Sequence, residues 1–145
     1  MIRYALSCVV LTIATEALAA GPNVCAVMPA AVVSTIVHQQ LVGAVSDVSE
    51  EAHKYGCSYG SRVPHVSISV IRPGGAAAFD RTHARLAQAV TVAGVGDKAL
   101  FEPDVGVIAV FGDTAIDAFV PSGSGTDAQR MALEKSLVTA VKNKL

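Results

Sequence analysis

The side chains that could carry out catalysis in this sequence are a few histidines and carboxylates without a complete catalytic spacing. Hydrolysis by nucleophilic attack needs a nucleophile, a base and a group that orients the base. His83 has Asp80 close by on one predicted helix, but the pattern implies no nucleophile for the pair. Asp113 and Asp117 are expected to approach Glu102 across neighbouring strands, although such carboxylates are more often a solvated face. A small secreted hydrolase that uses His83 or the Asp113 and Asp117 carboxylates is therefore one hypothesis.

Two further patterns imitate ligand sites without completing them. His53-x-x-x-Cys57 with His65 has the residue types of a zinc corner, but a disulfide would consume the thiol of Cys57. Gly94-Val95-Gly96-Asp97-Lys98-Ala99 has the outline of a dinucleotide-binding turn, which requires a long helix directly after the glycines. Pro103 follows too soon for that helix. We therefore predict no metal and no cofactor, and interpret the glycines as a tight turn that leads into a strand.

Binding of a partner is the function that remains, and two short loops could form the contact surface. The loop Gly94–Lys98 and the turn Phe101–Asp104 lie close together in the sequence. Tyr55 and Tyr59 have the spacing that places two side chains on one face of a strand. Exposed aromatics beside polar loops would form a contact patch, whereas the same aromatics in the core would be structural. The candidate contact residues are Gly94, Gly96, Asp97, Lys98, Phe101 and Glu102.

The balance of charges excludes partners that bind mainly through a strong electrostatic field of the protein. The 145 residues hold 11 Lys and Arg and 12 Asp and Glu, which gives a formal net charge of −1. This balance offers no basic surface that would attract nucleic acid or an anionic membrane. The absence of Trp and the 5% aromatic content argue against a stacking platform for bases or sugars. The leading hypothesis is a non-catalytic module that binds a small molecule or an envelope or extracellular protein, for example as an inhibitor of an extracellular enzyme.

The start of the chain has the pattern of a secretory signal peptide. Met1-Ile2-Arg3 is a short basic start, residues 4–15 are apolar, and Ala17-Leu18-Ala19 is a small-x-small cleavage site. The apolar run is too short to span a bilayer as a helix, and no later run is long enough to anchor the chain. We predict cleavage after Ala19 and a single periplasmic or secreted domain over residues 20–145, without a transmembrane anchor.

Cysteine usage agrees with an oxidising compartment. Cys8 would leave with the signal peptide, so Cys25 and Cys57 remain as an even pair. We predict a Cys25–Cys57 disulfide, which would stabilise the fold by about 3–4 kcal/mol, with two free buried thiols as the alternative. Neither Ala5-Leu6-Ser7-Cys8 nor Pro22-Asn23-Val24-Cys25 has the leucine and small residues of a good lipobox.

Helical periodicity and turn chemistry indicate the elements that must position these residues. Helices are expected from Pro29 to about Gly43, over about residues 76–90, and from Thr126, where Thr126-x-x-Gln129 is a capping box. Residues 44–53 favour a loop or an irregular strand. Strands are expected at residues 54–61, 66–72, 99–102, 107–111 and 114–120, with residues 60–64 connecting the first two.

The resulting order α-β-β-α-β-β-β-α predicts an α+β domain. Connections of hairpin length favour a mostly antiparallel sheet of five strands, with three helices packed on one face. The strand at residues 107–111 is apolar throughout, which indicates a central strand covered at least partly on both faces.

Several short motifs together resemble a known group of proteins. They are Cys25, Gly56-Cys57-Ser58-Tyr59 and Val92-Ala93-Gly94-Val95-Gly96-Asp97-Lys98-Ala99, within the order of elements described above. The sequence is similar to the small exported lipoprotein domains of unknown function that are common in actinobacteria. The resemblance implies an exported fold in the cell envelope and implies no activity. The chain departs from the group at its start, where the lipid-bearing Cys has no good equivalent.

Overall fold

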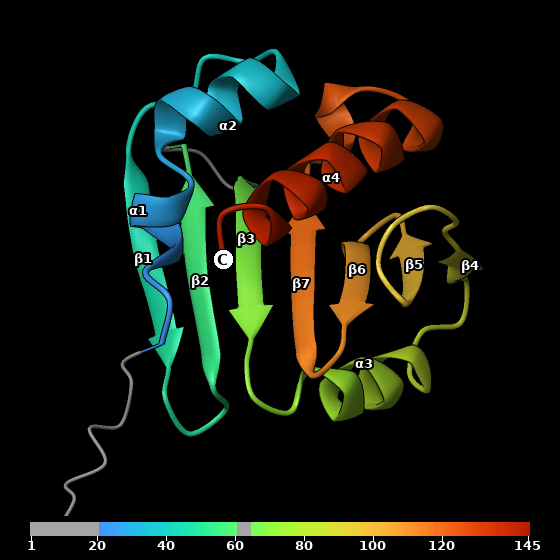
Figure 1. Cartoon of the computed structure of the whole chain (residues 1–145). Coiled ribbons are helices and arrows are strands. Elements are labelled where there is room, and N and C mark those ends of the chain that lie inside the picture. The colour runs from blue at the N-terminus through green and yellow to red at the C-terminus, as the bar shows by residue number, and fades with distance from the viewer. Residues whose placement is uncertain (1–20, 61–64) are drawn as a thin grey trace, which may run out of the picture.

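The computed structural model of the protein describes residues 21–60 and 65–145. The predicted signal peptide, residues 1–19, and residues 61–64 of the predicted connection lie outside the described residues. The described residues form one antiparallel sheet of seven strands in the order β1-β2-β3-β7-β6-β5-β4 (Figure 1). The two halves of the chain meet where β3 pairs with β7, because β7 returns to the middle of the sheet.

The α+β class, the antiparallel sheet and the disulfide are confirmed, whereas five strands and three helices were too few. The strands are β1 Ala44–Ser49, β2 Lys54–Tyr59, β3 Val66–Ile71, β4 Val90–Thr91, β5 Lys98–Glu102, β6 Gly106–Phe111 and β7 Thr114–Phe119. The α-helices of the described ranges are α1 Val24–Val27, α2 Ala30–Val37, α3 Gly75–His83 and α4 Asp127–Lys142, and a 3-10 turn, η1, spans Ser122–Ser124.

The sequence pattern leaves residues 44–53 open as a loop or an irregular strand, and β1 forms there. The other additional elements, α1 and β4, are short, which explains why the sequence pattern did not reveal them. All six residues of β1 are exposed at the edge of the sheet, so no alternation of apolar and polar residues marks the strand. The helix α1 has only four residues and begins where the Asn23 side chain accepts a hydrogen bond from the Ala26 N–H. The helix expected over residues 76–90 ends at His83. Val90 instead lies in β4, where it pairs with Phe101 of β5.

Helices cover both faces of the sheet, rather than the one face that we predicted. Successive side chains of a strand point to opposite faces, and every side chain of β6 is apolar. Val107 and Ala109 belong to the core on the side of α1, α2 and α4. Ile108 and Val110 belong to a second core that includes Phe79 of α3. Because both faces of β6 are apolar, each face requires its own helical cover, and α3 provides the second one (Figure 1).

The disulfide joins the N-terminal helices to the sheet. Cys25 in α1 bonds to Cys57 in β2, with the two Cα atoms 5.2 Å apart. Next to it, the hydroxyl of the buried Tyr59 donates a hydrogen bond of 2.7 Å to the carbonyl oxygen of Met28. These two links hold α1 against β2.

Candidate functional site

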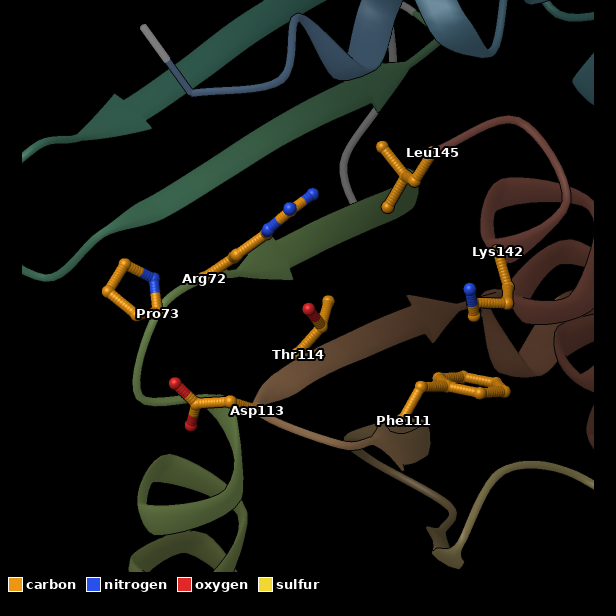
Figure 2. A pocket seen from close by; sticks show the side chains of 7 residues that line it. All are labelled: Arg72, Pro73, Phe111, Asp113, Thr114, Lys142 and Leu145. Carbon is orange, nitrogen blue, oxygen red and sulfur yellow. The ribbon is translucent and has the colours of Figure 1, made fainter. Parts of the chain in front are cut away.

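A cleft with a volume of 420 Å³ lies between the C-terminal end of α4, the end of β3 and the turn that joins β6 to β7 (Figure 2). We call it the Arg72–Lys142 cleft. Two cationic side chains, an aromatic ring and a hydroxyl group line it, together with apolar residues and one carboxylate. The lining residues are Arg72, Pro73, Phe111, Asp113, Thr114, Lys142 and Leu145.

Strand alternation and one tight turn position the floor of the cleft. Phe111 ends β6 and Thr114 begins β7, and the two residues are paired across the two-residue turn between them. Both side chains belong to the face that α4 covers, since Val107, Ala109 and Ile116 of the same strands pack in that core.

The walls of the cleft come from segments that are distant in the sequence. Arg72 directly follows β3, and its N–H donates to the carbonyl oxygen of His53. Lys142 is the last residue of α4. Asp113 joins the turn to the loop after Arg72, because its carboxylate accepts a hydrogen bond of 2.9 Å from the Gly74 N–H and its carbonyl oxygen accepts one from the Gly75 N–H. The cleft therefore depends on the tertiary fold and not on a local motif.

The two cations of the cleft have no carboxylate partner among the described residues. The ion pairs in that part of the chain join Lys98 to Asp80 and Arg130 to Asp127. The Lys142 ammonium instead lies 5.8 Å from the centre of the Phe111 ring, as a cation–π contact. Positive charge, a hydrogen-bonding hydroxyl and an aromatic surface thus meet in one cleft, which is suited to binding.

A second cavity, of 200 Å³, brings several predicted residues together beside α3. Lys98 pairs with Asp80 at 2.5 Å, and its ammonium group lies 5.0 Å from the centre of the Phe79 ring. The His83 ring lies 6.1 Å from the same ring. In the part of the chain that is described, no hydroxyl or thiol is hydrogen-bonded to His83, so the structure gives this histidine no nucleophile to activate.

Asp117 faces a third cavity, of 140 Å³, on the α3 side of the sheet. Its carboxylate accepts a hydrogen bond of 3.3 Å from the Ser69 hydroxyl. Burial raises the pKa of Asp117 to about 6, although the charge of Lys54 and the Ser69 hydrogen bond lower it. Asp113 precedes β7 and lies four residues from Asp117, which is about 13 Å along an extended chain. That spacing exceeds the roughly 5–9.5 Å between the two carboxyl groups of glycosidases.

The candidate contact loops divide into an exposed part and a buried part. Gly94, Gly96, Asp97 and Lys98 are exposed, and the Asp97 carboxylate accepts a hydrogen bond of 2.7 Å from the Gly112 N–H. Phe101 is only 3% exposed and packs in the core beneath Arg130, and Glu102 is half-buried. Tyr59 is also a core residue. Contact of the exposed loop residues with a partner stays a prediction.

The zinc-corner residues do not assemble into a metal site. Cys57 is bonded to Cys25, and within residues 21–60 and 65–145 no group of three His, Cys, Asp or Glu side chains could hold a metal ion. Across the same residues, every helix is too short or too polar to cross a membrane.

Sequence reasoning missed the most deeply buried charges, which are Arg130 and Glu134 on α4. Arg130 is 1% exposed and Glu134 is 0% exposed. The positions 130, 134, 137, 138 and 141 follow the helical period, so the stripe that contains Leu137 and Val141 could have revealed both residues. Arg72 and Lys142 were also missed as a pair, since no local pattern connects residues so far apart in the sequence.

Comparison of the chain with protein-family models, with curated proteins and with solved structures gave no match.

Proposed function

We propose that the protein is an exported, non-catalytic binding module and that the Arg72–Lys142 cleft is its ligand site. The observation that carries this proposal is the convergence of Arg72, Lys142, Phe111 and Thr114 on one cleft. Ligand sites are typically concave, with apolar walls and a few polar groups that fix the orientation of the ligand. The 420 Å³ of this cleft fall within the usual range of about 300–1,000 Å³.

Export is supported by the disulfide and by the signal-like start of the chain. A Cys25–Cys57 disulfide fits a protein that matures in an oxidising compartment, since cytosolic thiols are kept reduced. Binding to an envelope or extracellular protein belongs to the same proposal, with the exposed residues Gly94, Gly96, Asp97 and Lys98 as a second contact.

A role without catalysis is supported by the chemistry of the three cavities described above. Nucleophilic catalysis requires a hydroxyl or thiol within hydrogen-bond reach of a base. Both cysteines of the described ranges form the disulfide, and no serine or threonine of those ranges is hydrogen-bonded to a histidine.

Hydrolysis through Asp117 is the alternative that one observation favours. A carboxyl group with a pKa near 6 that faces a cavity resembles a general acid, and such shifts are frequent at active sites. The variants Asp117→Asn, Asp113→Asn and His83→Ala separate the two functions if a hydrolytic activity is found. Unchanged activity in all three variants would exclude the hydrolase that we considered.

The proposed ligand site is tested by a fragment screen that is monitored in ¹⁵N NMR spectra of the exported protein. The screen uses a mixed library of cationic, neutral and anionic fragments, so that no ligand class is assumed. We expect the amide signals of Phe111, Gly112 and Thr114 to shift with some fragments, while the signals of the Lys98 cavity stay in place. A screen in which no fragment shifts these three amides would contradict the proposed function.

A further inference from the structure

We infer that the ligand of the Arg72–Lys142 cleft is a small organic oxyanion, a carboxylate or a phosphate, joined to an apolar group that packs against Phe111. The inference rests on the proposed function, because it assigns a chemical class to the ligand of the same cleft. Figure 2 shows Arg72 and Lys142 entering the cleft from different sides, with Thr114 between them.

Unpaired positive charge is the first argument for an anion. Arg72 and Lys142 are the two cations of the cleft, and among the described residues neither forms an ion pair. Two like charges that line one cleft repel each other, and an anion placed between them removes this repulsion. A cationic ligand would increase it.

The carboxylate side chain that lines the cleft and the last carbonyl groups of α4 accept hydrogen bonds from backbone N–H groups. The Asp113 carboxylate accepts the hydrogen bond from the Gly74 N–H. The end of α4 has the negative pole of the helix dipole, but the carbonyl oxygens of Thr139 and Val141 accept hydrogen bonds from the N–H groups of Asn143, Lys144 and Leu145. The Asp113 carboxylate keeps its charge, so the side chains that line the cleft provide two positive charges and one negative charge.

The donor groups of the cleft match an oxyanion in geometry as well as in charge. The planar guanidinium of Arg72 can donate two parallel hydrogen bonds to a carboxylate or a phosphate. The Lys142 ammonium adds a second charge from the opposite wall, and the Thr114 hydroxyl can donate from the floor.

The volume of the cleft leaves room for more than an inorganic ion. A cavity of about 150 Å³ holds a benzene molecule, and 420 Å³ is nearly three times that volume. Phe111 is half-buried and Leu145 is exposed at the rim, so both offer apolar surface to the remainder of the ligand. The ligand is therefore an anion with an apolar group of ring size or larger.

Matched probes test this inference directly. Phenylacetate, phenylacetamide and phenethylamine have similar sizes but are anionic, neutral and cationic. We titrate each one into the ¹⁵N-labelled exported protein at low ionic strength and follow the amide signals of Phe111, Gly112 and Thr114. We expect phenylacetate to bind at least about tenfold more tightly than the amide, since a charge-assisted hydrogen bond contributes about one such factor. Phenyl phosphate, in a fourth titration, distinguishes a phosphate site from a carboxylate site.

Variants that remove the charge of Arg72 or Lys142 test whether these two cations cause the preference for the anionic probe. Arg72→Gln and Lys142→Gln should each weaken phenylacetate binding about tenfold and leave phenylacetamide binding unchanged. Arg85→Gln removes an exposed arginine outside the cleft and should change neither affinity. Equal binding of the anionic and neutral probes at these amides would overturn the oxyanion inference and keep the proposed ligand site. Preferential binding of phenethylamine would also overturn the inference.

Discussion

Arg130 and Glu134, one turn apart on α4, hold the two polar backbone groups of one residue, Val120. The Val120 N–H donates a hydrogen bond of 2.8 Å to Glu134 Oε1, and the Val120 carbonyl oxygen accepts one of 3.1 Å from Arg130. Arg130 also donates a hydrogen bond of 2.8 Å to the carbonyl oxygen of Pro103, after β5. The pair therefore fastens α4 to the ends of two strands and fixes the position of the helix that ends at the cleft.

The protonation of Glu134 should make the stability of the protein depend on pH near neutrality. Burial raises the pKa of Glu134 to about 7, against the lowering effects of the Val120 hydrogen bond and the Arg130 charge. An unfolded glutamate titrates near 4.5, so the folded state binds the additional proton between pH 4.5 and 7. The free energy of unfolding should therefore fall as the pH rises through this range, by about 1 kcal/mol between pH 6 and 8.

Denaturant titrations at pH 6 and pH 8 measure this effect. Glu134→Gln keeps an acceptor for the Val120 N–H and should remove most of the fall. In Asp117→Asn the fall should be smaller but still present, because the Asp117 carboxylate, with a pKa raised to about 6, titrates partly in this range and its charge also raises the pKa of Glu134. If Glu134→Gln lost as much stability as the unmodified protein between the two pH values, another group would be responsible.

Removal of the Arg130 side chain should destabilise the fold strongly. Arg130→Met keeps an apolar stem but leaves two carbonyl oxygens, of Val120 and Pro103, without their donor. A buried polar group that loses its partner costs about 1–3 kcal/mol, so we expect a total loss of roughly 2–4 kcal/mol in chemical unfolding. Arg81→Met on the exposed surface of α3 is the matched control and should change stability by less than about 0.5 kcal/mol. Similar results for the two variants would refute the structural role of Arg130.

The disulfide should contribute to stability through the loop that it closes. The sequence separation of 32 residues corresponds to about 3–4 kcal/mol in the chain-entropy model. The double variant Cys25→Ser with Cys57→Ser should lose this amount under oxidising conditions. Reduction of the unmodified protein should produce the same loss and should not affect the double variant. Equal stability of the oxidised protein and the double variant would show that the bond does not stabilise the fold.

Substitution of Gly75 should destabilise the fold, because the backbone at the start of β7 lies close to this residue. A Cβ atom at this position would overlap the backbone of Thr114 and Ala115, at the start of β7. Gly75→Ala should therefore displace α3 from the sheet and cost roughly 1–3 kcal/mol in thermal or chemical unfolding. Gly123→Ala is the control, since nothing lies within 4 Å of a Cβ atom there. A loss no larger than that of the control would contradict the contact.

The sequence predicted the elements whose side chains pack in the core. Alternation of Val66, Ile68 and Val70 with serines identified β3, and the Thr126–Gln129 capping box identified the start of α4, where both of its hydrogen bonds form. The exposed strand β1 could not be identified in this way, because an edge strand without buried side chains shows no alternation of apolar and polar residues. The apolar residues 107–111 predicted a strand covered on both faces, which is confirmed, but the sequence did not indicate that α3 covers the second face.

The candidate site was less predictable than the fold. Cys25 and Cys57 could be paired, since they are the even pair that remains after the predicted signal peptide. Whether Arg72 and Lys142 line the same cleft depends on how β3, β7 and α4 assemble, and no local spacing in the sequence encodes that assembly. Phe101, which we considered for a contact patch, became a core residue because its strand places it beneath Arg130.

A native mass spectrum of the protein purified from its natural source tests the central claim most directly. We predict a mature chain that begins at Ala20, with a bound small molecule that is released on denaturation. The bound mass should be lost in the double variant Arg72→Gln with Lys142→Gln and kept in Arg85→Gln. A chain without bound mass, or bound mass that persists in the double variant, would contradict a ligand in the Arg72–Lys142 cleft.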